Sequence, residues 1–135
     1  QDGRAAASVT VGYGDSATAT WRYSRGAGRW LRAEAWAPHR LENGRPVSAV
    51  NVIVLHTTRD LGFPEAGQSM IIPNLIDISG RLELFVGDKV IRGTWRKGGV
   101  NDPFTFTTED GEPLLLAPGN TWVECALEDT PVRVR

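Results

Sequence analysis

A chain of 135 residues in which 41% of the side chains are hydrophobic and 23% are charged has the size and composition of one folded domain. Its formal net charge of −1 gives no electrostatic reason to expect nucleic acid or an anionic membrane surface as a partner. The single cysteine, Cys125, excludes an internal disulfide, and no apolar run approaches the roughly 18 residues of a membrane-spanning segment. We therefore expect one domain with its own hydrophobic core.

The first quarter of the chain predicts a leader and a hairpin. Residues 1–7 are small and polar and are expected to be a flexible leader, and residues 8–11 suit a short edge strand. Residues 17–23 and 29–36 each alternate between two faces and are joined by a glycine-rich connection, which is typical of a β-hairpin.

The next segment contains the longest apolar run. A turn at Glu42-Asn43-Gly44 precedes residues 47–58, which are nearly continuous in β-branched and aliphatic side chains. Such a run is typical of a central strand that is buried on both faces. Residues 59–74 hold prolines and glycines and predict a long loop, which is a reasonable place for a functional element.

The second half of the chain is dense in short strands with turn residues between them. The pairs Ser79-Gly80 and Gly87-Asp88, and the segment 109–112, have turn chemistry. Strands are expected at 75–78, 81–86, 89–95, 104–107 and 121–127. The sequence therefore predicts that residues 8–135 form a single all-β domain, a partly open barrel or sandwich of mainly antiparallel strands.

Five tryptophans are a high number for a chain of this length. Trp30 and Trp36 alternate in phase with Arg32, and Trp122 shares a face with Glu124. Aromatic rings beside charges are typical of a groove that stacks sugars or binds peptides. The alternative is that tryptophans fill the core.

Trp21 and Trp95 are the strongest candidates for such core positions. Asn51 lies inside the otherwise apolar run at 47–58, and a buried amide must find hydrogen-bond partners. We therefore interpret Asn51 as a clamp to a neighbouring loop rather than as a ligand contact.

No pattern in the chain indicates catalysis or a metal. His39, His56 and Cys125 match no zinc-ligand spacing. A serine, His56 and Asp77 could form a triad on paper, but neither Ser48 nor Ser69 lies in a nucleophile elbow. We expect no catalytic residue, no metal and no cofactor.

Acidic side chains gather near turns. A pair of carboxylates could serve glycoside hydrolysis, but turn chemistry explains these positions more simply. The residues are Asp102, Glu109, Asp110 and Glu112. Lys97, at a strand end, could hold an anion, or it could simply be solvated.

The order of these pieces resembles the C-terminal domain of the YerB-like bacterial lipoproteins, a domain of unknown function. The similarity extends from about Val9 to about Glu124. Its most specific pieces are Asn-Val-Ile-Val at 51–54, Gly-Thr-Trp-Arg-Lys at 93–97 and Pro-Gly-Asn-Thr-Trp at 118–122.

The resemblance implies a β-rich domain that follows a larger N-terminal domain in a secreted, lipid-anchored protein of Gram-positive bacteria. The expected location is therefore extracytoplasmic, with the parent protein held at the membrane only through a lipid on its N-terminal part. This chain begins without that domain or an anchoring cysteine, and we expect it to be excised from a longer lipoprotein.

The function expected from these features is a non-catalytic extracytoplasmic module of a cell-envelope lipoprotein that binds or scaffolds another envelope protein or a cell-wall polymer. One alternative is part of an enzyme acting on a cell-wall polymer, with a site shared with the missing N-terminal domain. Another is a purely structural domain, which predicts a bare apolar patch. Besides the loop at 59–74, the candidate ligand-binding residues are Trp30, Arg32, Trp36, His39, Lys97 and Trp122.

Overall fold

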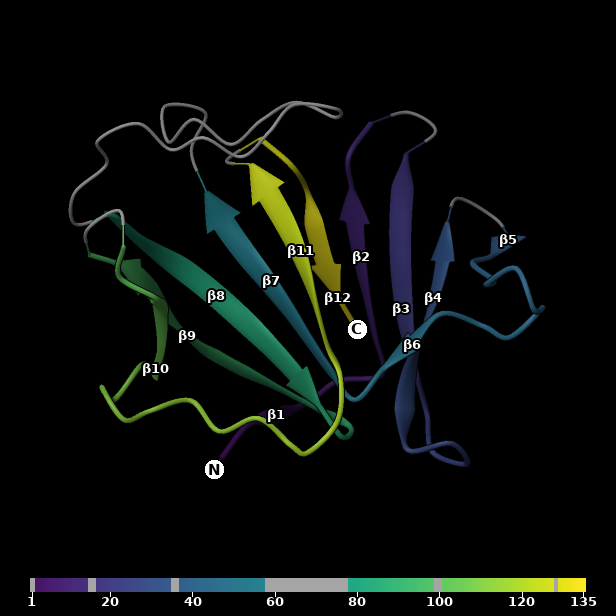
Figure 1. Cartoon of the computed structure of the whole chain (residues 1–135), viewed down its shortest axis with the longest axis horizontal. Coiled ribbons are helices and arrows are strands. Elements are labelled where there is room, and N and C mark those ends of the chain that lie inside the picture. Colours follow the sequence, from purple (N-terminus) through teal and green to yellow (C-terminus); the bar gives the residue numbers. More distant parts are fainter. Residues whose placement is uncertain (1, 15–16, 35–36, 58–77, 99–100, 128) are drawn as a thin grey trace.

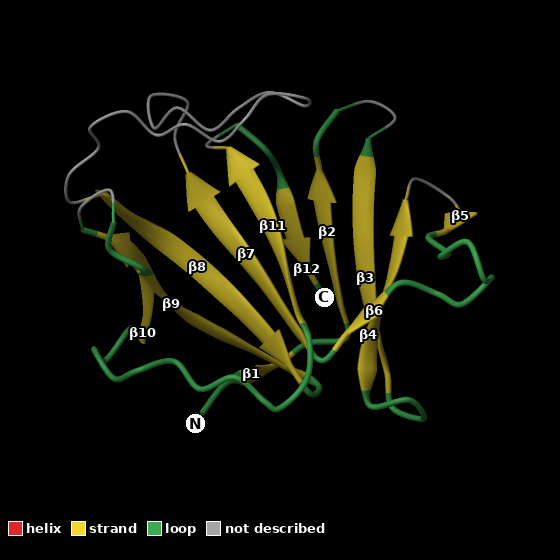
Figure 2. Cartoon of the chain, in the orientation of Figure 1, coloured by secondary structure: helices red, strands yellow, loops and turns green. Residues whose placement is uncertain are grey.

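The part of the chain that the structure describes folds into two mainly antiparallel β-sheets and contains no helix (Figures 1 and 2). The structure is a computed structural model. It describes residues 2–14, 17–34, 37–57, 78–98, 101–127 and 129–135. The predicted loop at 59–74 lies outside these residues.

One sheet is organised around β7 and is called the β7 sheet. It follows the order β1-β9-β8-β7-β11, and β10 also pairs with β9. All neighbours are antiparallel except β11, which runs parallel to β7. The strands are β1 (Arg4–Ala5), β7 (Asn51–Thr57), β8 (Ile78–Val86), β9 (Lys89–Lys97), β10 (Phe104–Thr108) and β11 (Thr121–Leu127).

The other sheet is organised around β3 and is called the β3 sheet. It is antiparallel throughout, with the order β12-β2-β3-β4-β5, and β6 pairs with β4. The strands are β2 (Ser8–Gly12), β3 (Thr18–Ser24), β4 (Arg29–Glu34), β5 (Ala37–Pro38), β6 (Ser48–Ala49) and β12 (Val132–Val134).

The chain passes between the two sheets without long connections. β1 belongs to the β7 sheet and β2 to the β3 sheet, while β6 and β7 are separated only by Val50. The sheets do not close on each other, so the fold is all-β and sandwich-like, as the sequence predicts.

The core lies between the sheets and continues on the second face of the β7 sheet. Trp21, Trp30 and Phe85 are fully buried between the sheets, and Trp30 packs edge-on against Phe85 with ring centroids 5.4 Å apart. On the other face, Ile53 and Trp95 belong to a second buried cluster. β7 contributes to both clusters, so the prediction of a central strand buried on both faces is confirmed.

Local turn chemistry predicted two hairpins correctly. β3 pairs with β4, and β8 pairs with β9 through a turn in which Gly87 has a φ of 55°. A φ in this left-handed region favours glycine, which has no Cβ to clash with the backbone.

The prediction of a turn at Ser79-Gly80 is wrong, because β8 runs through both residues. A Cβ on Gly80 would lie 2.5 Å from the His56 carbonyl oxygen and 2.5 Å from Trp95 Nε1. That indole nitrogen donates a hydrogen bond to the same carbonyl at 2.9 Å. The glycine is therefore used for a close approach of the Trp95 ring rather than for a change of direction.

The two ends of the described chain contain strands that the sequence did not predict. In the expected leader, Arg4–Ala5 forms β1 against β9, and Ala6 is buried. Residues 8–11 are not an edge strand, because β12 pairs with the far side of β2. A terminal strand of three residues carries too little periodicity to be predicted.

The clamp role of Asn51 is confirmed. Its side-chain amide donates to the Ala117 carbonyl at 2.9 Å, and its side-chain oxygen accepts from the Ala117 amide at 3.0 Å. A further contact of 3.3 Å joins the side-chain amide to the Thr121 hydroxyl. Asn51 thus fastens the segment before β11 to the start of β7.

Candidate functional site

The structure brings three of the six predicted ligand-binding residues together. Arg32 on β4, His39 just after β5, and Trp122 on β11 meet where the two sheets face each other. Trp36 lies outside the described residues. Trp30 is 0% exposed in the core, and Lys97 lies on β9 of the β7 sheet, away from this group.

Glu124 is the buried centre of this group, although the sequence pointed to it only as a neighbour of Trp122. It lies on β11, is 5% exposed, and receives donors from the opposite sheet. Its Oε1 accepts from Trp21 Nε1 at 3.1 Å and from Arg32 Nε at 2.9 Å, and its Oε2 accepts from the Tyr13 hydroxyl. One carboxylate therefore joins β11 to β3, to β4 and to the residue that follows β2.

Arg32 extends the network toward the surface. Its Nη1 donates to Glu34 Oε1 at 2.5 Å and lies 2.9 Å from His39 Nδ1. Its guanidinium carbon is 5.2 Å from the centroid of the Trp122 ring. Because an arginine only donates, this contact is a hydrogen bond in the tautomer in which His39 Nδ1 accepts.

We call these residues the Arg32 cluster: Tyr13, Arg32, Glu34, His39, Trp122 and Glu124. His39 Nδ1 is 3.6 Å from Glu34 Oε1, and the His39 and Trp122 rings meet edge to face at 6.3 Å. A cavity of about 410 Å³ lies beside the cluster and is lined by Tyr13, Ala17, Thr18, Ala19, Arg32 and Glu34.

The surroundings shift the pKa values of Tyr13 and Glu34 in the cluster and of Cys125 beside it. Burial raises the pKa of Tyr13 far above its ordinary value, and the hydrogen bond to Glu124 raises it further. The hydrogen bond from Arg32 lowers the pKa of Glu34, while burial raises the pKa of the neighbouring Cys125 thiol. Tyr13 thus remains a neutral donor, Glu34 remains ionised, and the thiol is poorly reactive.

The Arg32 cluster therefore connects the two sheets, and its charged side chains form ion pairs with one another. The sequence placed Trp30, Arg32 and Trp122 correctly on faces shared with charges. These faces point inward, however, and the charges are tolerated there because each has a partner across the interface.

Lys97 has a separate local environment. Its Nζ donates to the Asp102 carbonyl at 2.5 Å and lies 5.5 Å from the centroid of the Phe104 ring.

The acidic 109–112 segment is a turn, as predicted: the Gly111 amide donates to the Thr108 carbonyl at 3.0 Å. Among the described residues, no group of three histidine, cysteine or acidic side chains could hold a metal ion.

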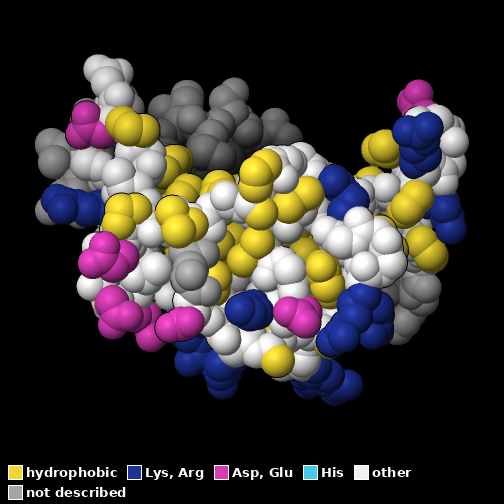
Figure 3. Space-filling model, turned by 90° about the horizontal axis from the view of Figure 1, so that it is seen from below, with side chains coloured by type: hydrophobic (Ala, Val, Ile, Leu, Met, Phe, Trp, Pro, Cys, Tyr) yellow, Lys and Arg dark blue, Asp and Glu magenta, His cyan; other side chains and the backbone are white. Residues whose placement is uncertain are grey.

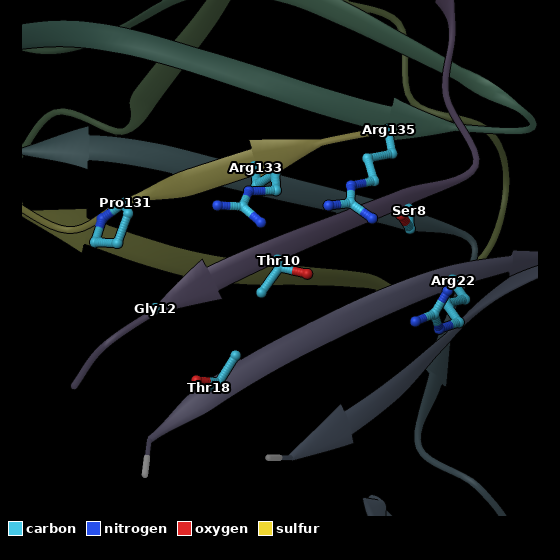
Figure 4. A pocket seen from close by; sticks show the side chains of 8 residues that line it. All are labelled: Ser8, Thr10, Gly12, Thr18, Arg22, Pro131, Arg133 and Arg135. Atoms are coloured by element: carbon cyan, nitrogen blue, oxygen red, sulfur yellow. The ribbon is translucent and has the colours of Figure 1, made fainter. Parts of the chain in front are cut away.

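A second concave surface lies on the outer face of the β3 sheet, and the sequence analysis missed it (Figure 4). Its volume is about 400 Å³, and it lies over β12, β2 and β3. We call it the arginine groove, and it is lined by Ser8, Thr10, Gly12, Thr18, Arg22, Pro131, Arg133 and Arg135.

Three exposed arginines surround a floor of small hydroxyl side chains in this groove. Figure 4 shows Arg133 and Arg135 on one side of Ser8 and Thr10, and Arg22 on the other. None of the lining residues is acidic, and within the described part of the chain none of these three arginines forms an ion pair.

A weak sequence signal for the groove existed. Arg22 alternates with the buried Trp21, and Arg133 and Arg135 alternate with Val132 and Val134, which pack against the core. The alternation assigns each arginine to an outer face. Only the pairing of β12 with β2 shows that all three arginines lie on the same face of the β3 sheet.

Comparison with known proteins places the chain in a family without an assigned activity. No described helix is long and apolar enough to cross a membrane. A search of curated proteins finds no match. The crystal structure of the YerB protein from Bacillus subtilis is similar in fold, with a TM-score of 0.71 at 22% sequence identity. The match covers 98% of this chain and 45% of the YerB chain, so this chain spans less than half of that protein's length.

The family model for the C-terminal domain of DUF3048, a protein of unknown function, matches residues 9–123. This range includes most of β2, all of β3 to β10 and the start of β11, and it contains Arg32, His39 and Trp122. The family resemblance expected from the sequence is confirmed. The chain belongs to the DUF3048 C-terminal domain family.

Proposed function

We propose that this domain is a non-catalytic binding module of a cell-envelope lipoprotein and that it contacts an anionic cell-wall polymer through the arginine groove. The proposal rests on the observation that three exposed arginines surround one concave surface, which has no acidic lining residue. A guanidinium offers five donors in a planar fork and binds phosphate or carboxylate oxygens in pairs.

The contrast with the Arg32 cluster supports this choice. Arg32 is largely buried and already donates to Glu124 and Glu34. Arg22, Arg133 and Arg135 are exposed and have no ionic partner among the described residues, so their positive charge is available to a ligand.

Co-sedimentation with purified Gram-positive cell walls tests the proposal. The chain is expected to pellet with the walls at low salt and to be released as salt rises, because screening weakens exposed charge contacts. A variant with Arg22→Gln, Arg133→Gln and Arg135→Gln is expected to stay in solution.

A charge-matched control carries Arg4→Gln, Arg45→Gln and Arg92→Gln, which change exposed arginines outside the groove. It is expected to pellet like the unchanged chain. Equal pelleting of both triple variants would overturn the proposal.

The extracytoplasmic, lipid-anchored location is part of the same proposal and rests on the resemblance to the YerB-like lipoproteins. Fractionation of cells that carry the full-length parent protein tests it. We expect the parent in the membrane fraction, with this domain open to protease added to protoplasts. Protection from that protease would place the domain inside the cell and contradict the proposal.

A scaffolding contact with another envelope protein is supported by apolar side chains on the surface. Leu115 and Leu116 are 61% and 44% exposed, in the segment between β10 and β11. Figure 3, which views the molecule from below, shows hydrophobic side chains gathered over the middle of that face. Leu116→Ser is expected to weaken such a contact while leaving wall binding unchanged, as measured by co-purification and by co-sedimentation.

One observation favours an enzymatic alternative in which the site is shared with another domain. Glu34 and His39 converge at 3.6 Å beside the cavity of about 410 Å³. If this pair performed acid–base chemistry, Glu34→Gln and His39→Gln would each abolish turnover of cell-wall polymer by the full-length parent. Our proposal expects no such turnover by the parent protein, with or without these substitutions.

A further inference from the structure

We infer that the arginine groove selects a linear phosphodiester polymer built from small polyols, in preference to peptides, nucleic acids and membrane surfaces. This inference rests on the proposed function, because it names the chemical class of the ligand for the same groove.

Strand register sets the spacing of the positive charges. Arg133 pairs with Thr10, which pairs with Thr20. One row further, Arg135 exchanges backbone hydrogen bonds with Ser8, and Ser8 pairs with Arg22.

Residues two apart on a strand are about 6.8 Å apart, and strands two places apart are separated by about 9.6 Å. Arg133 and Arg135 therefore follow β12, and Arg22 faces them across β2. Three charges spread over this area suit a ligand with several anionic groups better than a single anion.

The floor of the groove suits phosphate oxygens. Ser8 and Thr10 present hydroxyl groups between the arginines, and Thr18 presents one at the end of β3 away from Arg22. The Thr10 and Thr20 hydroxyl oxygens are 3.2 Å apart. Hydroxyl groups and arginines are among the usual partners of phosphodiester oxygens. The small side chains leave room for a thin chain to lie along the floor.

The same floor disfavours a peptide ligand. β2 is an interior strand, paired with β12 on one side and β3 on the other, so its backbone donors and acceptors are already used. An extended peptide that binds a sheet normally adds to a free edge. A polymer without amide groups needs no such partner.

The lining also disfavours single-stranded nucleic acid and membranes. Proteins that bind single strands stack the bases on aromatic rings, and none of the described residues that line the groove is aromatic. The three arginines flank a concave surface, which fits a thin chain better than the plane of a bilayer. A phosphodiester polymer with small, non-aromatic units meets both conditions.

Titration calorimetry with synthetic ligands tests the inference. The probe is an oligo(glycerol phosphate) of six repeats. The comparison ligands are inorganic phosphate, oligoglutamate and oligothymidylate of equal charge, and phosphatidylglycerol vesicles. We expect the oligo(glycerol phosphate) to bind at least tenfold more tightly than each comparison ligand.

Substitution of the arginines provides the second readout. Arg22→Gln, Arg133→Gln and Arg135→Gln are each expected to weaken binding about tenfold, the scale of one hydrogen bond to a charged group. Each is also expected to reduce the slope of log affinity against log salt by about 0.7, as for a single-stranded phosphodiester. Arg92→Gln, on β9, is the matched control and is expected to change neither quantity.

The two proposals fail in different ways. Wall binding that requires the arginines, combined with equal affinity for oligoglutamate or oligothymidylate, would overturn the inference and leave the proposed function standing. Tight binding to the vesicles would show that the groove binds lipid headgroups, and it would also overturn the inference. Wall binding that is unchanged when the three arginines are substituted would overturn both the inference and the proposed function.

Discussion

Tyr13 shows how one side chain can depend on a partner far along the chain. Its hydroxyl donates to Glu124, 111 residues away, across the space between the sheets. Tyr13 as a whole is 41% exposed, but its phenol group lies against Glu124. Burial of the phenol is the main reason why its pKa is raised, and ionisation would also remove the donor and place two negative charges together.

Tyr13→Phe is expected to destabilise the fold by about 1.5–3 kcal/mol, the range for a hydrogen bond to a charged group. Because the folded pKa of Tyr13 is raised, its contribution is fully present below the unfolded pKa of about 10 and is lost as the pH rises above it. The stability gap between the unchanged chain and Tyr13→Phe should therefore shrink between about pH 10 and pH 11.

Urea denaturation at a series of pH values measures this gap. Tyr23→Phe is the control, because Tyr23 packs against Trp30 and is not among the described donors to Glu124. A Tyr13 gap that stays constant above pH 10 would contradict the raised pKa of the phenol.

Within the β7 sheet, Gly80 and Trp95 form one unit on neighbouring strands. The indole lies over the glycine and reaches the His56 carbonyl on β7. Gly80→Ala is expected to cost about 1–3 kcal/mol, the usual range for overpacking, since the new methyl group would push against the ring and the carbonyl.

Thermal unfolding measures this cost. Gly26→Ala is the control, because a Cβ at Gly26 meets nothing within 4 Å. Equal melting temperatures for the two variants would show that the Trp95 ring moves aside without cost.

The contact between Asn51 and Ala117 belongs to the same scale, because it fastens a segment to a strand. Asn51→Asp keeps the acceptor for the Ala117 amide but loses the donor to the Ala117 carbonyl, whereas Asn51→Ala loses both. Amide hydrogen exchange at Ala117 is therefore expected to accelerate strongly in Asn51→Ala and less in Asn51→Asp. Unchanged exchange in both variants would mean that the segment is held by other contacts.

Over the whole molecule, the Arg32 cluster is a buried polar connection between the two sheets. Glu124 and Glu34 bind the same guanidinium, but Glu124 is 5% exposed while the Glu34 side chain is 59% exposed. Burial makes the Arg32–Glu124 pair contribute more to stability than the Arg32–Glu34 pair, because water cannot solvate a buried charge that has lost its partner.

Glu124→Gln is expected to destabilise the fold by about 3–5 kcal/mol, the range for breaking one side of a buried ion pair. Glu34→Gln is expected to cost less than about 1 kcal/mol, as exposed pairs do. Urea denaturation of both variants at neutral pH makes the comparison. Equal losses would show that the buried pair is not what holds the sheets together.

The sequence by itself determined the features that depend on neighbouring residues. Period-two alternation predicted the strands that became β3 and β4, the apolar run predicted a doubly buried β7, and the Gly87-Asp88 turn predicted the β8–β9 hairpin. The all-β class and the family followed from the same local patterns. These features are encoded within a few residues of each other.

Only the tertiary structure decided which faces point inward and which side chains meet. The parallel pairing of β11 with β7, about 70 residues apart in the chain, brings Glu124 and Trp122 to Arg32 and His39. The pairing of β12 with β2 places Arg133 and Arg135 opposite Arg22. Alternation along a strand separates its two faces, but it cannot say which one is covered, because the covering side chains come from strands far away in the sequence.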